Sequence, residues 1–163
     1  MKEKMCSWGT SFCVDMMDIK KGSAEKIGQW LALAEKEKDG FPGLETEEGL
    51  RQFRDSVLAH MERGAALEAR EAGRLAGVLL FDREGRTLDF LAVEREHRRK
   101  GIGRALCLKA LEEMPEGDIA VITHPPEAER GYAARAFYRS LDFEEGERIE
   151  IFGAPAQVFW LRR

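Results

Sequence analysis

The chain has 163 residues, the length of one ordinary domain, which is enough to bury a hydrophobic core without disulfides or metal. With 44% hydrophobic and 34% charged residues it has the composition of a globular protein, and its net charge of −4 creates no overall field that favours nucleic acid. No apolar run reaches the roughly 18 residues that span a bilayer, and the first eight residues lack the apolar stretch of a signal peptide. We therefore expect one domain over residues 1–163, in the cytoplasm, with no membrane and no nucleic-acid partner.

The three cysteines, Cys6, Cys13 and Cys107, are odd in number and lack the spacing of metal ligands. Cys107 falls in an apolar helical pattern, which indicates a core residue, whereas Cys6 and Cys13 are interpreted as incidental thiols. The sequence predicts neither a disulfide framework nor a metal site.

The N-terminal third predicts one strand and two helices. Residues 12–19 are a candidate strand. A helical apolar stripe follows Ser23 and consists of Ile27, Trp30, Leu31 and Ala34. Residues 40–43 break the chain, and Thr46 is placed to cap a second helix. The buried face of that helix would comprise Leu50, Phe53, Val57, Leu58 and Met61, and His60 is expected on its surface.

Beyond Gly64 the pattern becomes extended and predicts a meander of three strands. The predicted elements are a strand over 65–70, a turn over 71–74, a strand over 75–81, a turn over 82–86 and a strand over 87–93. The run 77–81 is almost wholly apolar, which suits a central strand covered on both faces.

The second half predicts two more helices and three more strands. A helix follows the glycines and ends at Pro115, and the strand over 119–123 is expected to be parallel to its predecessor because a helix connects them. Ala134, Phe137, Tyr138 and Leu141 mark one face of a short helix. Strands over 148–152 and 157–161, joined by a turn over 153–156, form a closing antiparallel pair. The result is a mixed α/β fold with helices on both faces of the sheet.

The segment from Arg98 to Ala105 joins a strand to a helix. The first turn of a helix leaves about four N–H donors without partners and carries roughly half a positive charge, so it can bind an anion. Gly101 and Gly103 let a phosphate approach the main chain. The basic residues Arg98, Arg99, Lys100 and Arg104 add positive charge.

Two nucleotide-binding motifs do not fit this segment. The P-loop pattern G-x-x-x-x-G-K-[ST] is absent. The dinucleotide fingerprint needs a third glycine at the position that Leu106 occupies.

The pattern that fits is [Q/R]-x-x-G-x-[G/A], formed by Arg98, Gly101 and Gly103. The surrounding stretch 88–106 resembles motif A of the GNAT superfamily of N-acetyltransferases. Downstream, residues 134–143, with the sequence ARAFYRSLDF, resemble the family's A-x-x-[FL]-Y-x-x-x-G-F segment. The resemblance covers residues 75–143 well.

The chain departs from the family pattern at two positions. Asp142 replaces the usual glycine before Phe143, and Gly131 stands where many members carry an asparagine that helps to hold the cofactor. Because Asp tolerates left-handed backbone better than most residues, we expect the first change to be structurally mild. The second removes one side-chain contact.

The resemblance implies a mixed, mainly antiparallel central sheet flanked by helices on both faces, with a parallel pair around the CoA-binding turn. It implies direct transfer of an acetyl group from acetyl-CoA, as cosubstrate and without a metal, to a primary amine in a ternary complex. The backbone of residues 90–93 would bind the pantetheine arm and polarise the thioester, and the turn would bind the pyrophosphate. The cofactor-binding residues implied are Leu91, Ala92, Val93, Arg98, Arg99, Lys100, Gly101, Ile102, Gly103, Arg104 and Ala105.

By the same resemblance, Tyr138 is the natural general acid toward the CoA sulfur. A phenol, with an ordinary pKa of about 10, stays protonated at neutral pH and can donate to a thiolate. The alternative is an aromatic residue that only packs beside Phe137.

The general base stays open between Asp89, Glu94, His124 and water. Each side chain also has a structural interpretation: Asp89 can face solvent, Glu94 can pair with nearby arginines, and His124 can belong to a surface loop. His97 is expected to pack against the sheet.

Three alternatives remain open: a catalytically silent acyl-CoA-binding module, an acetyltransferase directed at protein or charged tRNA, and a nucleic-acid-binding domain. The acidic balance and the lack of aromatics in the basic run argue against the last. We expect a small-molecule or peptide amine as acceptor and a monomer or homodimer. The resemblance places the acceptor site on residues 22–61 and 148–158. Five acidic residues in these ranges or directly beside them would suit a cationic amine: Glu45, Glu47, Glu48, Glu147 and Glu150.

Overall fold

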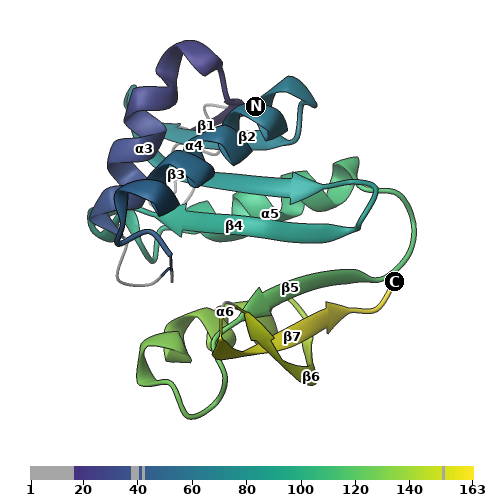
Figure 1. Ribbon diagram of the computed structural model, residues 1–163. Coiled ribbons are helices and arrows are strands. Elements are labelled where there is room, and N and C mark those ends of the chain that lie inside the picture. Colours follow the sequence, from purple (N-terminus) through teal and green to yellow (C-terminus); the bar gives the residue numbers. More distant parts are fainter. Residues whose placement is uncertain (1–16, 38–40, 42, 152) are drawn as a thin grey trace. The chain divides into compact units, whose positions relative to one another are not determined.

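The computed structural model describes residues 17–37, 41, 43–151 and 153–163 (Figure 1). Its elements, in chain order, are β1 (Met17–Lys21), η1 (Ala24–Lys26), α3 (Ile27–Lys36), α4 (Glu47–Glu62), β2 (Ala66–Glu71), β3 (Arg74–Asp82), β4 (Thr87–Val93), η3 (Arg95–His97), α5 (Ile102–Glu113), β5 (Ile119–Thr123), η4 (Glu129–Gly131), α6 (Tyr132–Ser140), β6 (Glu144–Ile151) and β7 (Ala154–Leu161).

Hydrogen bonding orders the seven strands β1-β2-β3-β4-β5-β7-β6. The β1–β2, β2–β3, β5–β7 and β6–β7 pairs are antiparallel, whereas β4 and β5 are parallel through Thr87↔Ala120 and Leu88↔Val121. This confirms the predicted mixed, mainly antiparallel sheet with one parallel pair. No helix among the described residues has the length and apolarity to cross a bilayer.

One predicted boundary lies outside the described residues, and another differs from the structure. The strand predicted over 12–19 is described only from Met17, and residues 12–16, like Cys6, Cys13 and most of the predicted break at 40–43, lie outside the described residues. The turn predicted over 153–156 is wrong, because the chain reverses at Gly153 (φ 78°) and β7 already begins at Ala154. The closing strands are therefore longer than the apolar pattern indicated, because β6 is a mostly exposed strand rich in glutamate.

The described residues fall into two compact units. The N-terminal unit contains residues 17–80 and 90–112, and the C-terminal unit contains residues 81–89 and 113–163. The single domain predicted for residues 1–163 stays a prediction.

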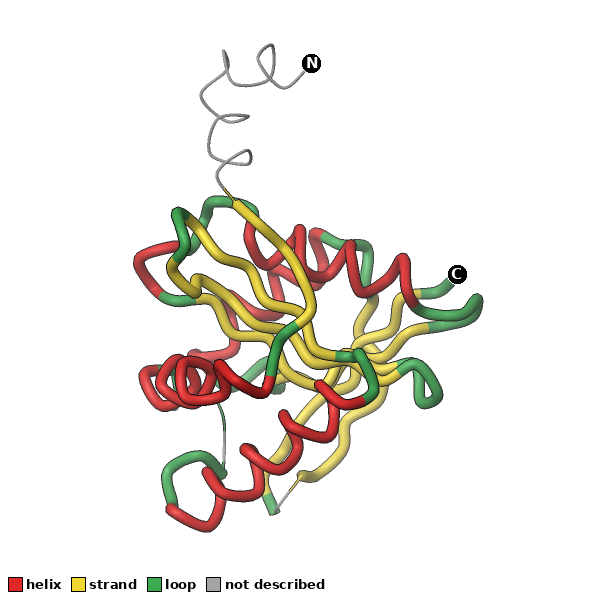
Figure 2. The backbone as a smooth tube through the Cα atoms, turned by 90° about the horizontal axis from the view of Figure 1, so that it is seen from above, coloured by secondary structure: helices red, strands yellow, loops and turns green. Residues whose placement is uncertain are grey.

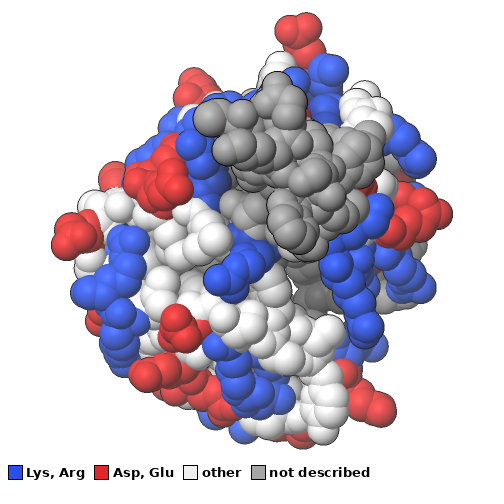
Figure 3. All heavy atoms as spheres, turned by 180° about the vertical axis from the view of Figure 1, so that it is seen from behind, with Lys and Arg blue, Asp and Glu red and all other residues white. Residues whose placement is uncertain are grey.

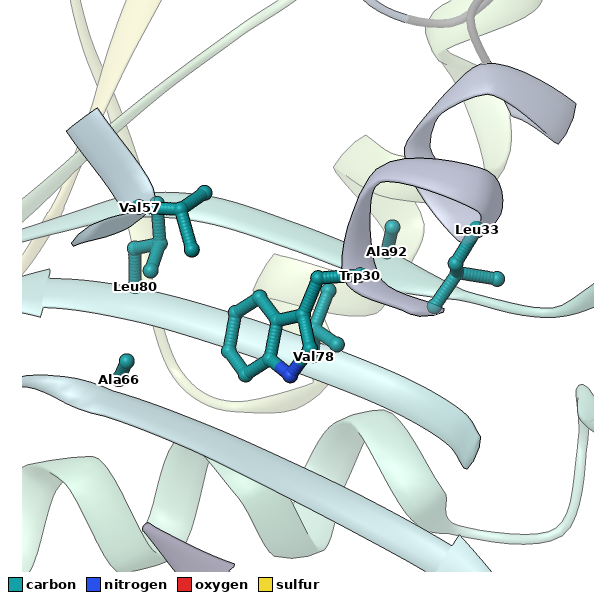
Figure 4. Close-up of a cluster of buried hydrophobic side chains, with 7 residues drawn as sticks. All are labelled: Trp30, Leu33, Val57, Ala66, Val78, Leu80 and Ala92. Carbon is teal, nitrogen blue, oxygen red and sulfur yellow. The ribbon is translucent and has the colours of Figure 1, made fainter. Parts of the chain in front are cut away.

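One face of the strands in the N-terminal unit is covered by α3 and α4. Figure 4 shows the cluster at this contact, in which the Trp30 ring lies over the strand that carries Val78. The buried members of the cluster are Trp30 and Leu33 of α3, Val57 of α4, and Ala66, Val78, Leu80 and Ala92 of the strands. Each fully buried large side chain here stabilises the fold by about 1.5–3 kcal/mol.

The opposite face of the same strands is covered by α5 (Figures 1 and 2). A Cβ on Gly77 would lie 3.0 Å from Ile102 and 3.2 Å from Leu106, so glycine allows α5 to approach β3 closely. The helix buries Ile102, Leu106, Cys107 and Ala110. This confirms that the apolar run of β3 is covered on both faces and that Cys107 is a core residue, and burial raises the pKa of its thiol to about 12.

The turn predicted between β2 and β3 is confirmed as a two-residue hairpin. Ala72 (φ 52°) and Gly73 (φ 82°) are both left-handed, which is the backbone of a type I′ turn and matches the twist of the flanking strands.

The cap of α4 is confirmed and the position of one histidine is not. The Thr46 hydroxyl accepts a hydrogen bond from the amide of Gly49 at 2.9 Å. His60, expected on the surface, is only 7% exposed. Its Nδ1 lies 2.7 Å from the Ser56 carbonyl. The apolar stripe of the helix, to which a histidine does not belong, gave no sign that this side of the last turn is covered.

A buried polar network lies next to the Trp30 cluster. Glu68, in the middle of β2, accepts hydrogen bonds from Trp30 Nε1 at 3.0 Å and from Arg70 Nε at 2.7 Å. Arg70 also donates to Gln29 Oε1 at 2.7 Å. The two charged side chains are 2% and 8% exposed, so each depends on the other for compensation of its charge.

We expect Glu68→Gln, which keeps the shape but removes the charge opposite Arg70, to lower the free energy of unfolding by about 3 kcal/mol. Urea denaturation measures this. The control is Glu48→Gln, whose ion pair with Arg51 is exposed, with an expected loss below about 1 kcal/mol. Equal losses in the two variants would contradict the assignment of Glu68 as a buried compensating charge.

Candidate functional site

The predicted turn leads from the end of β4 into α5. The amide of Glu94 donates to the Ala76 carbonyl at 2.8 Å and so holds the end of β4 to β3, and η3 follows. The first hydrogen bond of α5 runs from the amide of Ala105 to the carbonyl of Gly101 at 3.0 Å. The amides of residues 102–104 precede that bond, so they are the donors that a helix offers to an anion at its start.

Two residues of the turn have left-handed backbone. Gly101 has a φ of 82° and Arg99 has a φ of 65°. A left-handed residue next to right-handed helical residues directs successive amides toward one point, the arrangement known as an anion-binding nest. For Arg99 this backbone costs on the order of 1–2 kcal/mol, so the contacts around the turn must hold it in place.

Two cations of the turn are paired with carboxylates. Arg98 donates from Nε to the Val93 carbonyl at 3.0 Å and from Nη2 to Glu37 Oε1. Lys100 lies 3.2 Å from Glu71 Oε1. Arg99 and Arg104, by contrast, are exposed and have no ion-pair partner in the part of the chain that the structure describes.

Glu71 also accepts a hydrogen bond from Nδ1 of His97, 2.5 Å away. His97 is 9% exposed and packs at the end of β2, as expected from the sequence. The hydrogen bond from His97, together with Lys100, holds the pKa of Glu71 below its ordinary value. The carboxylate is therefore ionised at neutral pH, and its contribution to stability is lost only as the pH falls through that lowered pKa.

The main chain of β4 has one edge paired with β3 and one edge that is not paired beyond Leu88. Glu94 donates toward β3, and a Cβ on Gly77 would lie 3.4 Å from the Ala92 carbonyl, so Ala92 also faces β3. By the alternation of an antiparallel ladder, Leu91 and Val93 face the other edge. Among the described residues the parallel ladder with β5 includes only Thr87 and Leu88. Leu91 therefore offers its N–H and C=O groups at an open edge.

In the C-terminal unit, Tyr138 lies on α6 and is 7% exposed. Its ring packs against Phe137 and Phe143 at centroid distances of 5.1 and 5.7 Å. Asp142 has a φ of 72°, which confirms that this position requires left-handed backbone and that Asp adopts it after the helix end. The motif residues thus form one packed helix terminus around Tyr138.

Gly131, the other departure from the family pattern, is buried against His124. A Cβ on Gly131 would lie 2.3 Å from the Cβ of His124, a separation that no real pair of side chains shows. His124 thus fills the space that a side chain at position 131 would need.

The candidate bases have different surroundings. Glu94 is buried and accepts from Lys36 at 3.0 Å, so its partner is a lysine and not the arginines expected from the sequence. Asp89 is exposed and accepts from the Thr87 hydroxyl at 2.6 Å. His124 is half-buried beside Gly131. The choice of base stays a prediction.

No group of three or more metal-ligating side chains occurs in the ranges described.

Three of the acidic residues expected near the acceptor are engaged locally. Glu45 accepts from the amide of Gly43, Glu48 pairs with Arg51 and accepts from Gln52, and Glu147 accepts from Trp160 Nε1 at 2.9 Å. The indole of Trp160 holds the pKa of Glu147 below its ordinary value. The negative charge of these side chains is therefore a weaker indication of a cationic acceptor than the sequence suggested.

Sequence reasoning missed the two carboxylates that hold the turn. Glu37 and Glu71 lie 61 and 29 residues from their basic partners, and no local pattern connects such positions.

The structure also contains a cleft of about 350 Å³ beside Glu94. It is lined by Gln29, Ala32, Leu33, Lys36, Arg70, Gly73, Arg74, Leu75 and Glu94.

The basic run, residues 94–104, is also a candidate nucleic-acid surface. On the face drawn in Figure 3, Lys and Arg side chains are interspersed with Asp and Glu. Nucleic-acid binding needs clustered positive charge. That face therefore gives the alternative no support.

Comparisons with known proteins point to one family. Residues 30–143 match the family model described as "Acetyltransferase (GNAT) family". A search among curated protein sequences found no relative of significant similarity.

Solved structures share the fold at low sequence identity. YncA from Salmonella typhimurium, solved with its cofactor acetyl-CoA, has a TM-score of 0.69 and 15% identity over 90% of this chain and 94% of its own. The PaiA N-acetyltransferase from Thermoplasma acidophilum, in complex with coenzyme A, has a TM-score of 0.67 and 18% identity over 90% and 99%. The ribosomal-protein-S18-alanine N-acetyltransferase from Escherichia coli has a TM-score of 0.68 and 18% identity over 90% and 94%.

We expect Gly131→Asn to destabilise the protein by about 1–3 kcal/mol, because the new Cβ overlaps His124. The matched control is Gly153→Asn, where the backbone is left-handed but the space around it is open. Asn tolerates left-handed backbone, so this variant should lose little stability. Urea denaturation of both variants checks the expectation, and equal stability would show that His124 moves aside freely.

Proposed function

Because this chain belongs to the acetyltransferase (GNAT) family, we propose that it transfers the acetyl group of acetyl-CoA to a primary amine by direct attack in a ternary complex. The observation that carries the proposal is the turn itself: a left-handed Gly101, the free first amides of α5 and basic side chains gather at the end of β4. This is the arrangement that binds a pyrophosphate.

The open edge of β4 supports the same donor. When bound, acetyl-CoA supplies an activated acyl group as a thioester. The pantetheine arm carries amides that can pair with the free N–H and C=O groups of Leu91 along that edge. A backbone N–H at this edge can also donate to the thioester oxygen and stabilise the negative charge that develops there. YncA and PaiA, which share the fold, were solved with acetyl-CoA and coenzyme A.

The reaction needs two proton transfers, one from the amine to a base and one from an acid to the leaving sulfur. The attacking amine forms the new C–N bond and loses a proton to a base, for which Asp89, Glu94, His124 and water are the candidates. The C–S bond breaks, and we assign to the Tyr138 hydroxyl the donation of a proton to the leaving sulfur. Packing of the Tyr138 ring between Phe137 and Phe143 supports a fixed position for that hydroxyl. No metal is needed for these steps.

The alternatives that remain concern the identity of the acceptor and whether the protein turns over at all. The Escherichia coli neighbour acts on a ribosomal protein, so a protein amine is one candidate and a small-molecule amine is another. A silent acyl-CoA-binding module is the alternative that kinetics can exclude. Release of free thiol from acetyl-CoA, measured with a panel of amines and peptides, distinguishes these.

We expect Gly101→Asp to abolish acetyl-CoA binding, because a carboxylate would occupy the place of the phosphate. Gly73→Asp is the matched control, since Gly73 has the same φ of 82° and open space around it, so the backbone strain is equal. Calorimetry on both variants measures the affinity. Wild-type affinity in Gly101→Asp would refute the assignment of the turn.

We expect Tyr138→Phe to lower kcat by about a hundredfold with unchanged acetyl-CoA affinity, because the proton donor is lost while the ring packing stays. Tyr132→Phe, at a tyrosine that is 66% exposed, is the control and should turn over like the wild type. The assay is thiol release with the best amine of the panel. Unchanged turnover in Tyr138→Phe would remove its catalytic role.

A further inference from the structure

The basic residues of the turn are of two kinds. Arg98 and Lys100 are each paired with a carboxylate, whereas Arg99 and Arg104 are exposed and unpaired within the described ranges. We propose that the paired cations hold the turn in its conformation through their ion pairs, and that the unpaired cations are the side chains that bind the phosphates of acetyl-CoA. The inference rests on the proposed function and assigns separate roles to residues that the sequence treats alike.

Arg98 is fixed from two directions. Its guanidinium bonds the carbonyl of Val93, the last residue of β4, and the carboxylate of Glu37, at the end of α3. The Glu37 side chain is only 9% exposed. An ionised carboxylate with so little water around it needs a cation, so transfer of Arg98 to a phosphate would leave a buried charge uncompensated. Glu37 is therefore a positioning residue for the turn.

Glu71 fixes the other side of the turn. Its carboxylate is 15% exposed and accepts from both His97 and Lys100, which flank Arg98 and Arg99. This holds the segment before Gly101 against the β2–β3 hairpin. Glu71 thus supports the left-handed backbone at Arg99, which would relax if the segment were free.

For Arg99 and Arg104, in contrast to Arg98, binding a phosphate leaves no buried carboxylate uncompensated. Both are exposed, and in the described part of the chain neither loses a protein partner when a phosphate approaches. Arg99 precedes Gly101 by two residues, and Arg104 lies in the first turn of α5. Guanidinium groups at these positions exchange only water for phosphate oxygens, which is the favourable exchange.

The test compares Arg99→Gln, Lys100→Gln and Glu71→Gln in the full chain, with acetyl-CoA affinity measured by calorimetry at several salt concentrations. Arg99→Gln keeps the left-handed non-glycine backbone and removes one phosphate contact. It should weaken binding about tenfold and flatten the salt dependence, with an unchanged melting temperature. With S-acetylpantetheine, a donor without phosphates, its turnover should equal that of the wild type.

Glu71→Gln should give the contrasting result: weaker acetyl-CoA binding, a lower melting temperature and an unchanged salt dependence, because no phosphate contact is removed. Lys100→Gln should likewise leave the salt dependence unchanged. Tighter or equal binding by Glu71→Gln, or a salt dependence flattened in Lys100→Gln as in Arg99→Gln, would overturn the division of roles. Absence of acetyl-CoA binding by the wild type would instead overturn the proposed function, so the two failures are distinguishable.

Discussion

The close contact between α5 and β3 is the constraint on which the candidate site depends. Gly77 has no side chain, so Ile102 and Leu106 can pack directly on the sheet, next to the Ala92 carbonyl of β4. Ile102 is the first residue of α5, and its burial fixes the start of the helix at the end of the strand. A larger residue at position 77 would push the helix outward and move its free amides away from the edge of β4. Packing in the core therefore determines where an anion can be bound.

The charges around the turn extend this relation between core and surface. Glu37, Glu71 and Glu94 have side chains between 9% and 15% exposed, and each is compensated by a basic residue. A carboxylate at this depth keeps its partner, whereas an exposed cation exchanges partners with solvent at little cost. Arg98 and Arg99 are adjacent in the sequence and carry the same charge. Their surroundings differ, so Arg98 stays paired with a carboxylate whereas Arg99 can exchange water for a phosphate.

Local patterns predicted most of the elements, but they could not predict contacts between residues that are distant in the chain. The hairpin at Ala72 and Gly73, the Thr46 cap and the parallel β4–β5 pair follow from turn chemistry, capping and connection length, which act within a few residues. The pairing of Glu71 with Lys100 and the burial of His60 depend on residues that are distant in the chain or on the cover supplied by packing. Periodicity contains no information of that kind, so the turn was predictable and its supporting carboxylates were not.

The same limit explains why the acceptor is harder to infer than the donor. A pyrophosphate is recognised by backbone geometry, and backbone geometry leaves a trace in the positions of glycines and of the helix start. An amine is recognised by side-chain charges whose availability depends on their neighbours. Glu147 shows this: in the sequence it is one more acidic residue of the closing hairpin, but its carboxylate accepts from the Trp160 indole. The charges that can receive a cationic amine are those left after such local pairing, so composition overstates them.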